Sequence, residues 1–346
     1  MKKSLLISAV AVAALSALAL TGCSASGGST SKRACVILPD TQSSPRYESA
    51  DRPALEAGLK AAGFEADVQN AQGDTAKYAT IADQQMSKGC GVMILDDLQG
   101  AAVGVAEKAK KAGIPSIAYD RPFAGADYYV SFDNEGVGAL EGQSILDGLK
   151  AAGKDPATAS VVYVGGDPAD GNAKMFYDGA VGVLSAAGVK PAAETPGTWD
   201  GAKAGTAFEQ AYTKLGGKVD AVWVANDTNA AAVIAILDKN GKTVPVSGQD
   251  ASVAGLQNVL LGKQTATVYK PAKVEAAAAV ELAVALLKGE KPTANKQLAD
   301  GTPFIAVTPI LVGPDKVIEV VTAGDATVKD LCTAAVAAAC AKYGVK

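Results

Sequence analysis

The stretch GVMILDDLQGAAVGVAEKAKKAGIPSIAYDR, residues 91–121, decides the fold class of this chain. Its apolar run Val92–Leu95 has the length and composition of a buried strand, and a second such run follows at Ser116–Tyr119. The alanine-rich segment between them has helical spacing and ends at Gly113, where a left-handed C-terminal cap suits glycine. This order of elements predicts a βαβ unit with two parallel strands.

The same alternation runs through the rest of the chain. Short apolar runs are predicted as strands at Cys35–Leu38, Glu65–Gln69, Val92–Leu95, Ser116–Tyr119, Tyr129–Phe132, Ser160–Val164, Ala221–Ala225, Val244–Ser247 and Thr265–Tyr269. The helices between them are predicted to stop at Gly63, Gly89, Gly113, Gly153, Gly188, Gly216, Gly241 and Gly262. Because about five βα units precede Asn134 and about four follow it, we expect an α/β fold with two doubly wound parallel-sheet lobes.

Polar side chains follow nearly every predicted strand. In open parallel sheets ligands bind outside the carboxyl ends of the strands, so these positions are the candidates for a site. They include Asp40, Arg46, Tyr47, Asp96, Asp97, Asp120, Arg121, Asp133, Asn134, Asp170, Asn172, Asn226, Asp227, Gln249, Asp250 and Lys270. Asp and Asn are also favoured as helix N-caps, which remains the alternative for any one of them.

This mixture of carboxylates, amides and cations suits a neutral polyhydroxylated ligand. Each sugar hydroxyl both donates and accepts a hydrogen bond, and planar side chains can meet neighbouring hydroxyls in pairs. The rings of Tyr47 and Trp199 are candidates to stack on the C–H face of a sugar. Acidic groups alone would suit calcium, but Arg121 and Lys270 would repel a cation, so no metal is expected.

Composition excludes several function classes. Histidine is absent from all 346 residues, which removes the commonest general base, the Ser-His-Asp triad and the usual zinc ligand. The formal net charge is −4, so there is no basic footprint for nucleic acid. We therefore expect a binding protein rather than an enzyme, without a cofactor.

Two glycine-containing stretches partly match nucleotide-binding motifs. Gly136-Val137-Gly138-Ala139-Leu140-Glu141 begins like a dinucleotide fingerprint, but the carboxylate of Glu141 at its sixth position would repel a pyrophosphate. Gly241-Lys242-Thr243 lacks the upstream glycine of a phosphate loop and precedes a strand instead of a helix. The glycines of the first stretch are interpreted as sites of close packing.

Four of the cysteines are predicted to form two disulfides. Cys35 and Cys90 each open a strand, and the first and third strands of a doubly wound sheet are neighbours. Cys332 and Cys340 are the remaining pair. In one unbroken helix their eight-residue separation would span about 12 Å, so their bond predicts a bent C-terminal segment. Four free thiols are the alternative.

The N-terminal residues have the pattern of a bacterial lipoprotein signal. An apolar run at residues 4–20 follows two lysines and is too short and too rich in small residues for a membrane span. It closes on Leu20-Thr21-Gly22-Cys23, a lipobox. We expect residues 1–22 to be a signal peptide, Cys23 to carry the lipid, and residues 23–33 to be a flexible tether to the outer face of the cell membrane. An ordinary signal peptide is the alternative.

Six motifs carry a resemblance that covers nearly the whole mature chain. They are Ala118–Arg121, Tyr129–Asn134, Gly165–Lys174, Ala225–Asp227, Ser247–Asp250 and Thr267–Pro271. With them the chain resembles ABC-transporter solute-binding proteins of the type I periplasmic fold, in the xylose-binding branch. The resemblance implies a monomer with two lobes joined by three hinge crossings, which captures a monosaccharide and delivers it to permease and ATPase subunits. The lobes implied are residues 34–134 plus 271–307 and residues 135–270 plus 308–346.

The resemblance also assigns roles to single residues. It implies sugar contacts from Arg46, Arg121, Asp170, Asn172, Asn226 and Asp250, with Lys270 at a hinge crossing. Trp199 matches a tryptophan that lines the pocket, and Tyr47 stands where the family usually has tryptophan. Asp120 is a further contact or a partner of Arg121. The stretch between Asp40 and Asp51 is spaced differently from the family pattern.

Alternatives from other classes remain open. A glycosidase could use Asp170 and Asp250 as its carboxylate pair, but nearby Arg121 and Lys270 would keep both ionised and leave no general acid. A membrane-tethered sugar sensor shares the same fold and pocket. A nucleoside-binding lipoprotein is the third alternative, for which more aromatic residues at the strand ends are expected. Among sugars, xylose is preferred and glucose, galactose and arabinose stay open.

Overall fold

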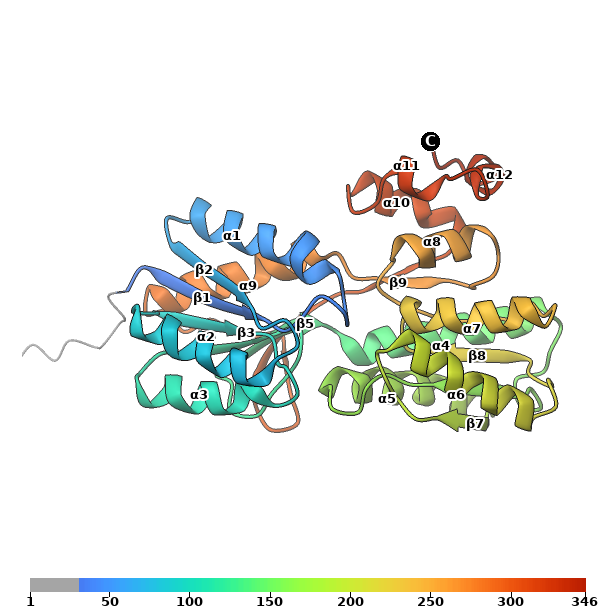
Figure 1. Cartoon of the computed structure of the whole chain (residues 1–346), viewed down its shortest axis with the longest axis horizontal. Coiled ribbons are helices and arrows are strands. Elements are labelled where there is room, and N and C mark those ends of the chain that lie inside the picture. Colours follow the sequence, from blue (N-terminus) through green and yellow to red (C-terminus); the bar gives the residue numbers. More distant parts are fainter. Residues whose placement is uncertain (1–30) are drawn as a thin grey trace, which may run out of the picture.

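The computed structural model describes residues 31–346 and contains two sheet-based lobes that lie side by side along the long axis of the molecule (Figure 1). The predicted signal peptide and Cys23 lie outside the described residues. In each lobe helices cover both faces of a mostly parallel sheet, as the alternation of apolar strands and amphipathic helices predicts.

The first lobe contains a seven-stranded sheet in the order β10-β11-β5-β4-β3-β1-β2. Its strands are β1 (Arg33–Leu38), β2 (Glu65–Asn70), β3 (Val92–Leu95), β4 (Ser116–Tyr119), β5 (Tyr128–Phe132), β10 (Lys296–Gln297) and β11 (Pro303–Val307). All neighbours are parallel except β10 and β11. The order β2-β1-β3-β4-β5 places a topological switch point between β1 and β3, where ligands of such sheets bind.

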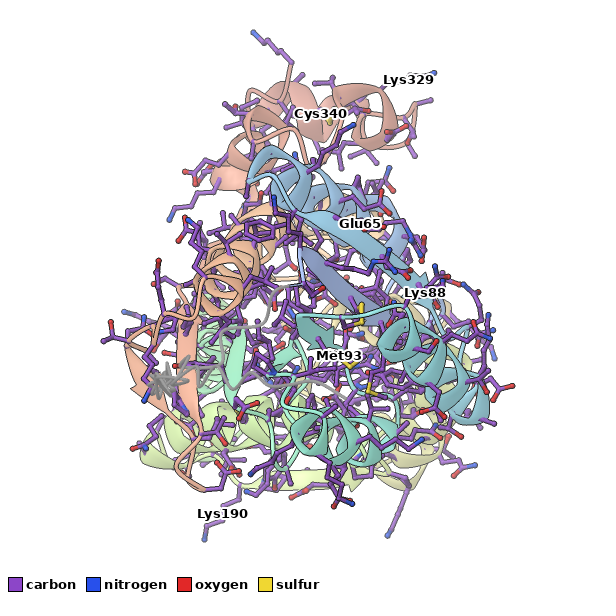
Figure 2. The ribbon with its side chains drawn as sticks, turned by 90° about the vertical axis from the view of Figure 1, so that its left-hand side faces the viewer. Glu65, Lys88, Met93, Lys190, Lys329 and Cys340 are labelled. Atoms are coloured by element: carbon purple, nitrogen blue, oxygen red, sulfur yellow. A yellow bond between two sulfur atoms is a disulfide. The ribbon has the colours of Figure 1, made fainter. Side chains whose placement is uncertain are left out.

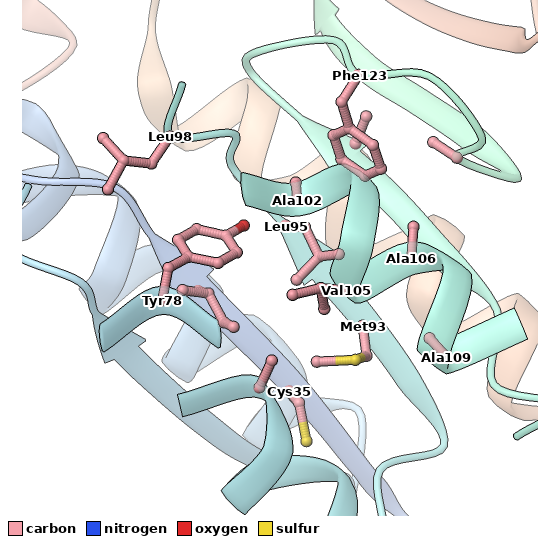
Figure 3. Packing of buried hydrophobic residues seen from close by; sticks show 14 of the residues in the cluster. Cys35, Tyr78, Met93, Leu95, Leu98, Ala102, Val105, Ala106, Ala109 and Phe123 are labelled. Carbon is pink, nitrogen blue, oxygen red and sulfur yellow. The ribbon is translucent and has the colours of Figure 1, made fainter. Parts of the chain in front are cut away.

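Buried apolar side chains on both faces of this sheet pack against the helices. On one face, α2 (Thr75–Ser87) and α3 (Ala101–Lys111) bury Tyr78 and Val105 against Met93 and Leu95, as Figure 3 shows. On the other face lie α1 (Arg52–Ala61) and α9 (Ala272–Leu287). Both sides of the strands are therefore buried, which explains why they are continuously apolar in sequence.

The second lobe repeats this strand order with less regular strands. Its three-stranded sheet has the order β7 (Pro191–Thr195), β6 (Val161–Val164), β8 (Ala221–Val224), and single parallel bridges extend it through Val246 and Val268. The helices α4 (Asn134–Ala151) and α5 (Gly171–Ala186) cover one face, and α6 (Gly201–Lys214) and α7 (Asp227–Lys239) cover the other. The prediction of two similar lobes is confirmed at the level of strand order.

Most of the predicted strands are confirmed to within two residues. The predicted strand Val244–Ser247 is wrong: the chain there forms only one isolated bridge, between Val246 and Val222. The strand β7 was missed because its sequence, Pro-Ala-Ala-Glu-Thr, lacks β-branched apolar residues and lies largely exposed at a sheet edge. The eight predicted helix-stop glycines all have positive φ, between 61° and 89°.

Close helix packing accounts for the glycines of the fingerprint-like stretch. A Cβ added to Gly138 on α4 would lie 1.9 Å from the carbonyl oxygen of Phe176 on α5. A Cβ added to Gly179 on α5 would lie 2.0 Å from the carbonyl oxygen of Glu135. The two helix backbones therefore touch at glycines, and the interpretation of Gly138 as a packing residue is confirmed.

Three crossings join the lobes. The chain passes from β5 into α4, from β9 (Thr267–Tyr269) into α9, and from β11 into β12 (Ile310–Val312), and β9 pairs antiparallel with β12. Sheet membership supports the lobes proposed from the sequence, residues 34–134 plus 271–307 and residues 135–270 plus 308–346.

The C-terminal segment packs on α8 (Val253–Leu260) of the second lobe, above β9 in Figure 1. It contains α10 (Val317–Thr322), α11 (Val328–Leu331) and α12 (Ala337–Lys342). The chain bends between α11 and α12, and Cys332 bonds Cys340 across the bend with a Cα–Cα distance of 5.9 Å. Figure 2 labels Cys340 in this segment at the top of the molecule. The second disulfide joins Cys35 to Cys90, with 5.8 Å between Cα atoms.

Candidate functional site

A polar cavity lies between the lobes, where the carboxyl ends of the strands from both sheets meet. The ten residues predicted as ligand contacts all line it, and four further residues join them. The lining is Ser43, Ser44, Arg46, Tyr47, Asp120, Arg121, Asp170, Asn172, Phe176, Trp199, Asn226, Gln249, Asp250 and Lys270. Its volume of about 40 Å³ is room for only a few water molecules, and openings of about 470 and 700 Å³ flank it.

The charges of this cavity cancel in pairs. Each of its three cations lies next to one of its three carboxylates: Arg46 Nη2 is 2.8 Å from Asp120 Oδ1, Arg121 Nε is 3.3 Å from Asp170 Oδ2, and Lys270 Nζ is 3.0 Å from Asp250 Oδ1. The Arg121–Asp170 pair joins the two lobes across the cavity, whereas each of the other two pairs lies within one lobe. With equal numbers of positive and negative groups, the lining offers no net attraction to a charged ligand.

The wall on the first lobe centres on Asp120. Its backbone has φ of 58°, a conformation that non-glycine residues rarely adopt and that often occurs at functional sites. The hydroxyl of Tyr47 donates to Asp120 Oδ2 at 2.6 Å, and the Tyr47 ring contacts the guanidinium groups of Arg46 and Arg121. Burial alone would raise the pKa of Asp120, but the charges of Arg46, Lys270 and Arg121 hold it below its ordinary value.

An unusual turn brings Arg46 to this wall. Residues Tyr47–Asp51 form a π-helix immediately before α1, and Arg46 is its N-terminal cap residue. A π-helix contains an extra residue per turn and commonly occurs at functional sites. This turn lies in the stretch between Asp40 and Asp51, which in the sequence is spaced differently from the pattern it resembles.

The wall on the second lobe consists of helix caps. Asp170 accepts from the Asn172 amide at 2.9 Å as the N-cap of α5, and its other oxygen accepts from Trp199 Nε1 at 3.1 Å. Asn226 caps α7 by accepting from the Asn229 amide at 2.9 Å. Capping and lining the cavity are therefore compatible roles for these side chains. Burial raises the pKa of Asp170.

Asn172 ties the two lobes together beside the cavity. Its Nδ2 donates to the carbonyl oxygen of Asp120 at 2.8 Å, and its Oδ1 accepts from the Tyr129 hydroxyl and from Asn134 Nδ2, both at 2.9 Å. Three of its four hydrogen-bonding positions are thus occupied, and one N–H remains for a ligand.

Sequence reasoning missed several groups at this site. Phe176 lies one helical turn after Asn172 on α5, and the Lys270 ammonium lies 5.3 Å from its ring centre. Helical spacing from Asn172 was the signal that could have found it. Ser43 accepts from Arg121 Nη2 at 2.8 Å, but it lies in a loop where no pattern distinguishes it from its neighbours.

Among the helices of residues 31–346, none is both long and apolar enough to cross a bilayer. Within the same residues, no group of three or more His, Cys, Asp or Glu side chains is arranged to hold a metal ion.

Comparisons with known proteins agree with this geometry. The family described as "Periplasmic binding protein domain" matches residues 35–291. The chain is 35% identical over 284 residues to the D-xylose-binding periplasmic protein of Haemophilus influenzae, which covers 78% of this chain and 83% of that protein. It is 33% identical over 279 residues to a multiple sugar-binding periplasmic protein of Azospirillum brasilense, which covers 73% of this chain and 77% of that protein.

A solved structure extends the likeness to three dimensions. The ABC transporter solute binding protein of Clostridium phytofermentans, with bound β-D-glucose, has a TM-score of 0.77 and 27% identity, covering 86% of this chain and 99% of that chain. The chain therefore has the type I periplasmic binding protein fold and belongs to the periplasmic binding protein family, a family of solute-binding proteins rather than enzymes.

Proposed function

We propose that this chain is the extracytoplasmic solute-binding component of an ABC sugar importer, which captures a monosaccharide between its two lobes. The observation that carries this proposal is the one-to-one pairing of three cations with three carboxylates in the cavity. A neutral sugar can exchange hydrogen bonds with both members of each pair without disturbing the charge balance. A phosphorylated or acidic sugar would leave an excess negative charge in a buried site.

The ten lining residues named from the sequence are the proposed sugar contacts. Residues of both lobes take part, so a bound sugar gains contacts as the lobes close and thereby stabilises the closed state. One hydrogen bond to a charged group contributes about 1.5–3 kcal/mol, so a few of them exceed the roughly 8 kcal/mol of a micromolar complex before ordering costs are subtracted. The closed form is proposed to be the one that permease and ATPase subunits receive.

D-xylose is the sugar we prefer. The similar proteins named above are described as binding D-xylose, multiple sugars and β-D-glucose, which supports a small neutral sugar and leaves a choice among them. A pocket discriminates xylose from glucose only by excluding a hydroxymethyl group, which changes the binding free energy by about 1–3 kcal/mol. Glucose, galactose and arabinose are therefore the competing ligands.

Calorimetry of the purified mature chain against pentoses, hexoses and nucleosides tests this proposal. We expect micromolar or tighter binding of one pentose or hexose and weaker binding of the others. Binding of nucleosides alone would support the nucleoside-binding alternative, and binding of no sugar would reject the proposal. Light scattering on the same sample is expected to give the mass of a monomer with and without sugar.

We further propose that Cys23 anchors the chain to the outer face of the cell membrane. The lipobox Leu20-Thr21-Gly22-Cys23 and the Ser/Gly-rich residues after it support this anchor. In a bacterial host, the wild-type chain is expected in the membrane fraction with an acylated N-terminal peptide by mass spectrometry. Cys23→Ser is expected to move it to the soluble fraction, and an unacylated wild-type N-terminus would exclude the anchor.

A further inference from the structure

The guanidinium of Arg46 is held by carboxylates on three sides. Asp120 lies 2.8 Å from Nη2 on the side of the cavity, Glu275 Oε2 lies 3.0 Å from Nη1, and Asp51 Oδ2 lies 3.5 Å from Nε. The side chains of Asp51 and Glu275 are fully buried, and neither residue lines the cavity. These two carboxylates therefore support Arg46 from behind, while Asp120 faces the ligand space.

Glu275 occupies a special place in the fold. It lies in the first turn of α9, the helix that begins directly after the Lys270-Pro271 crossing between the lobes. Lys270 pairs with Asp250 in the second lobe, whereas Glu275 contacts Arg46 in the first. Within five residues the chain thus connects the two charge pairs on opposite walls of the cavity. A change in direction at this crossing displaces the end of α9 that carries Glu275.

The charge balance behind Arg46 leaves this guanidinium available to a ligand. Burial raises the pKa of Glu275 to about 8 and that of Asp51 to about 6, although Arg46 opposes both shifts. Burial thus favours the protonated form of Glu275, whereas the neighbouring cations favour the ionised form of Asp120. Both Nη atoms of Arg46 are buried and close to oxygens, yet neither has an acceptor in hydrogen-bond geometry. Nη2, on the cavity side, is the atom placed to donate to a sugar hydroxyl.

We propose that Glu275 is a positioning residue for ligand capture, which holds the Arg46 guanidinium toward the cavity and links its orientation to the hinge crossing at Lys270-Pro271. The proposal rests on the function proposed above, because it concerns the same sugar site. Glu275 does not touch the sugar itself. It acts through Arg46. Without Glu275 the Arg46 guanidinium would be less ordered, and the sugar would bind less tightly.

Two substitutions of Glu275 test this role by calorimetry with the sugar that the wild-type chain binds. Glu275→Leu removes the group that holds Nη1, so the dissociation constant is expected to rise by about tenfold or more, as the loss of one oriented charged hydrogen bond implies. Glu275→Gln keeps an oxygen at the same place and resembles the protonated acid, so its affinity is expected to stay within about threefold of the wild type. Glu281→Leu, on the exposed face of the same helix, is the matched control.

The pH profile supplies a second readout that a merely structural role would not change. A sugar hydroxyl that binds Arg46 draws the guanidinium toward the cavity and weakens its stabilisation of ionised Glu275. The pKa of Glu275 then rises further, so the complex holds the proton more tightly. Affinity is therefore expected to be highest below pH 8 and to fall as the pH rises through that value, and Glu275→Gln is expected to remove this fall. The charged and titratable groups that face Glu275 are Arg46, Asp51, Tyr119, Asp120, Tyr129 and Lys270.

The outcomes separate this proposal from the proposed function. Wild-type affinity in Glu275→Leu, or an equal loss in Glu275→Gln and Glu275→Leu, would overturn the positioning role while sugar binding by the wild type stands. If Glu275→Leu does not fold, the pH profile of Glu275→Gln decides, and a fall in affinity as steep as in the wild type overturns the role. If the wild-type chain itself binds no sugar, the proposed sugar-binding function is rejected, whereas the contact between Glu275 and Arg46 is not.

Discussion

Replacing Gly166 by alanine should weaken ligand binding by displacing Trp199 alone. A Cβ at position 166 would lie 2.1 Å from Trp199 Cη2, whereas ordinary contact begins at 3.4 Å, so the ring must move by about 1.3 Å. The hydrogen bond of 3.1 Å from Trp199 Nε1 to Asp170 cannot survive such a shift. The displaced ring can no longer stack on the sugar, a contact of about 0.5–1.5 kcal/mol, which predicts a dissociation constant about two- to tenfold higher.

The neighbouring glycine provides the control for this experiment. A Cβ at Gly165 meets nothing within 4 Å, and neither glycine has a positive φ. Calorimetry with the bound sugar should therefore find wild-type affinity for Gly165→Ala and the loss only for Gly166→Ala. The melting curve of unliganded Gly165→Ala should stay close to the wild type, whereas that of Gly166→Ala should shift modestly to lower temperature through the loss of the Trp199–Asp170 hydrogen bond. Equal affinities for the two variants would refute the assignment of Trp199 to the pocket wall.

The other predictions concern charge and packing. Asp250 has φ of 94°, a region that asparagine tolerates better than most residues, so Asp250→Asn should keep the turn yet remove the negative charge that lies 3.0 Å from Lys270. Calorimetry should show at least about a tenfold loss of sugar affinity, and an unchanged value contradicts the role of this charge pair. Because the lining charges cancel, raising the salt concentration should change wild-type affinity by less than about twofold, and a steep decrease would indicate a charged ligand. Gly138→Ala should lower the free energy of unfolding by about 1–3 kcal/mol, because its added Cβ clashes with the Phe176 carbonyl oxygen. Gly182→Ala is the control and should leave the free energy of unfolding unchanged, because its added Cβ meets nothing within 4 Å. Denaturant titration measures both variants, and equal midpoints would refute the close packing of α4 on α5.

The strands and the cavity lining were predictable from the sequence for the same physical reason. Strands buried on both faces must be continuously apolar, as Val92–Leu95 is, and so the polar residue directly after each strand stands out. Asp120, directly after Ser116–Tyr119, was identified in this way. The exposed edge strand β7 shows no contrast between apolar strand residues and a polar residue after them, because an exposed strand does not need to be apolar.

The two carboxylates that lie behind Arg46 could not be predicted in this way. Asp51 and Glu275 lie in helical turns, where a carboxylate is ordinarily a solvated surface group, and nothing local distinguishes them from exposed glutamates such as Glu281. Their burial depends on Arg46, which reaches them only because of the π-helical turn before α1. Such a cluster is a property of tertiary contacts rather than of sequence spacing.

The three crossings also determine the order in which the chain can be completed during synthesis. Strand β11 pairs with β5 and covers its outer edge, although some 170 residues, most of them in the other lobe, separate them in sequence. A nascent chain that emerges with its N-terminus first therefore exposes the open edge of β5 until Pro303–Val307 has followed. Completion of the first sheet is thus postponed almost to the end of synthesis, which leaves a long interval in which the chain can still be threaded through a translocation channel.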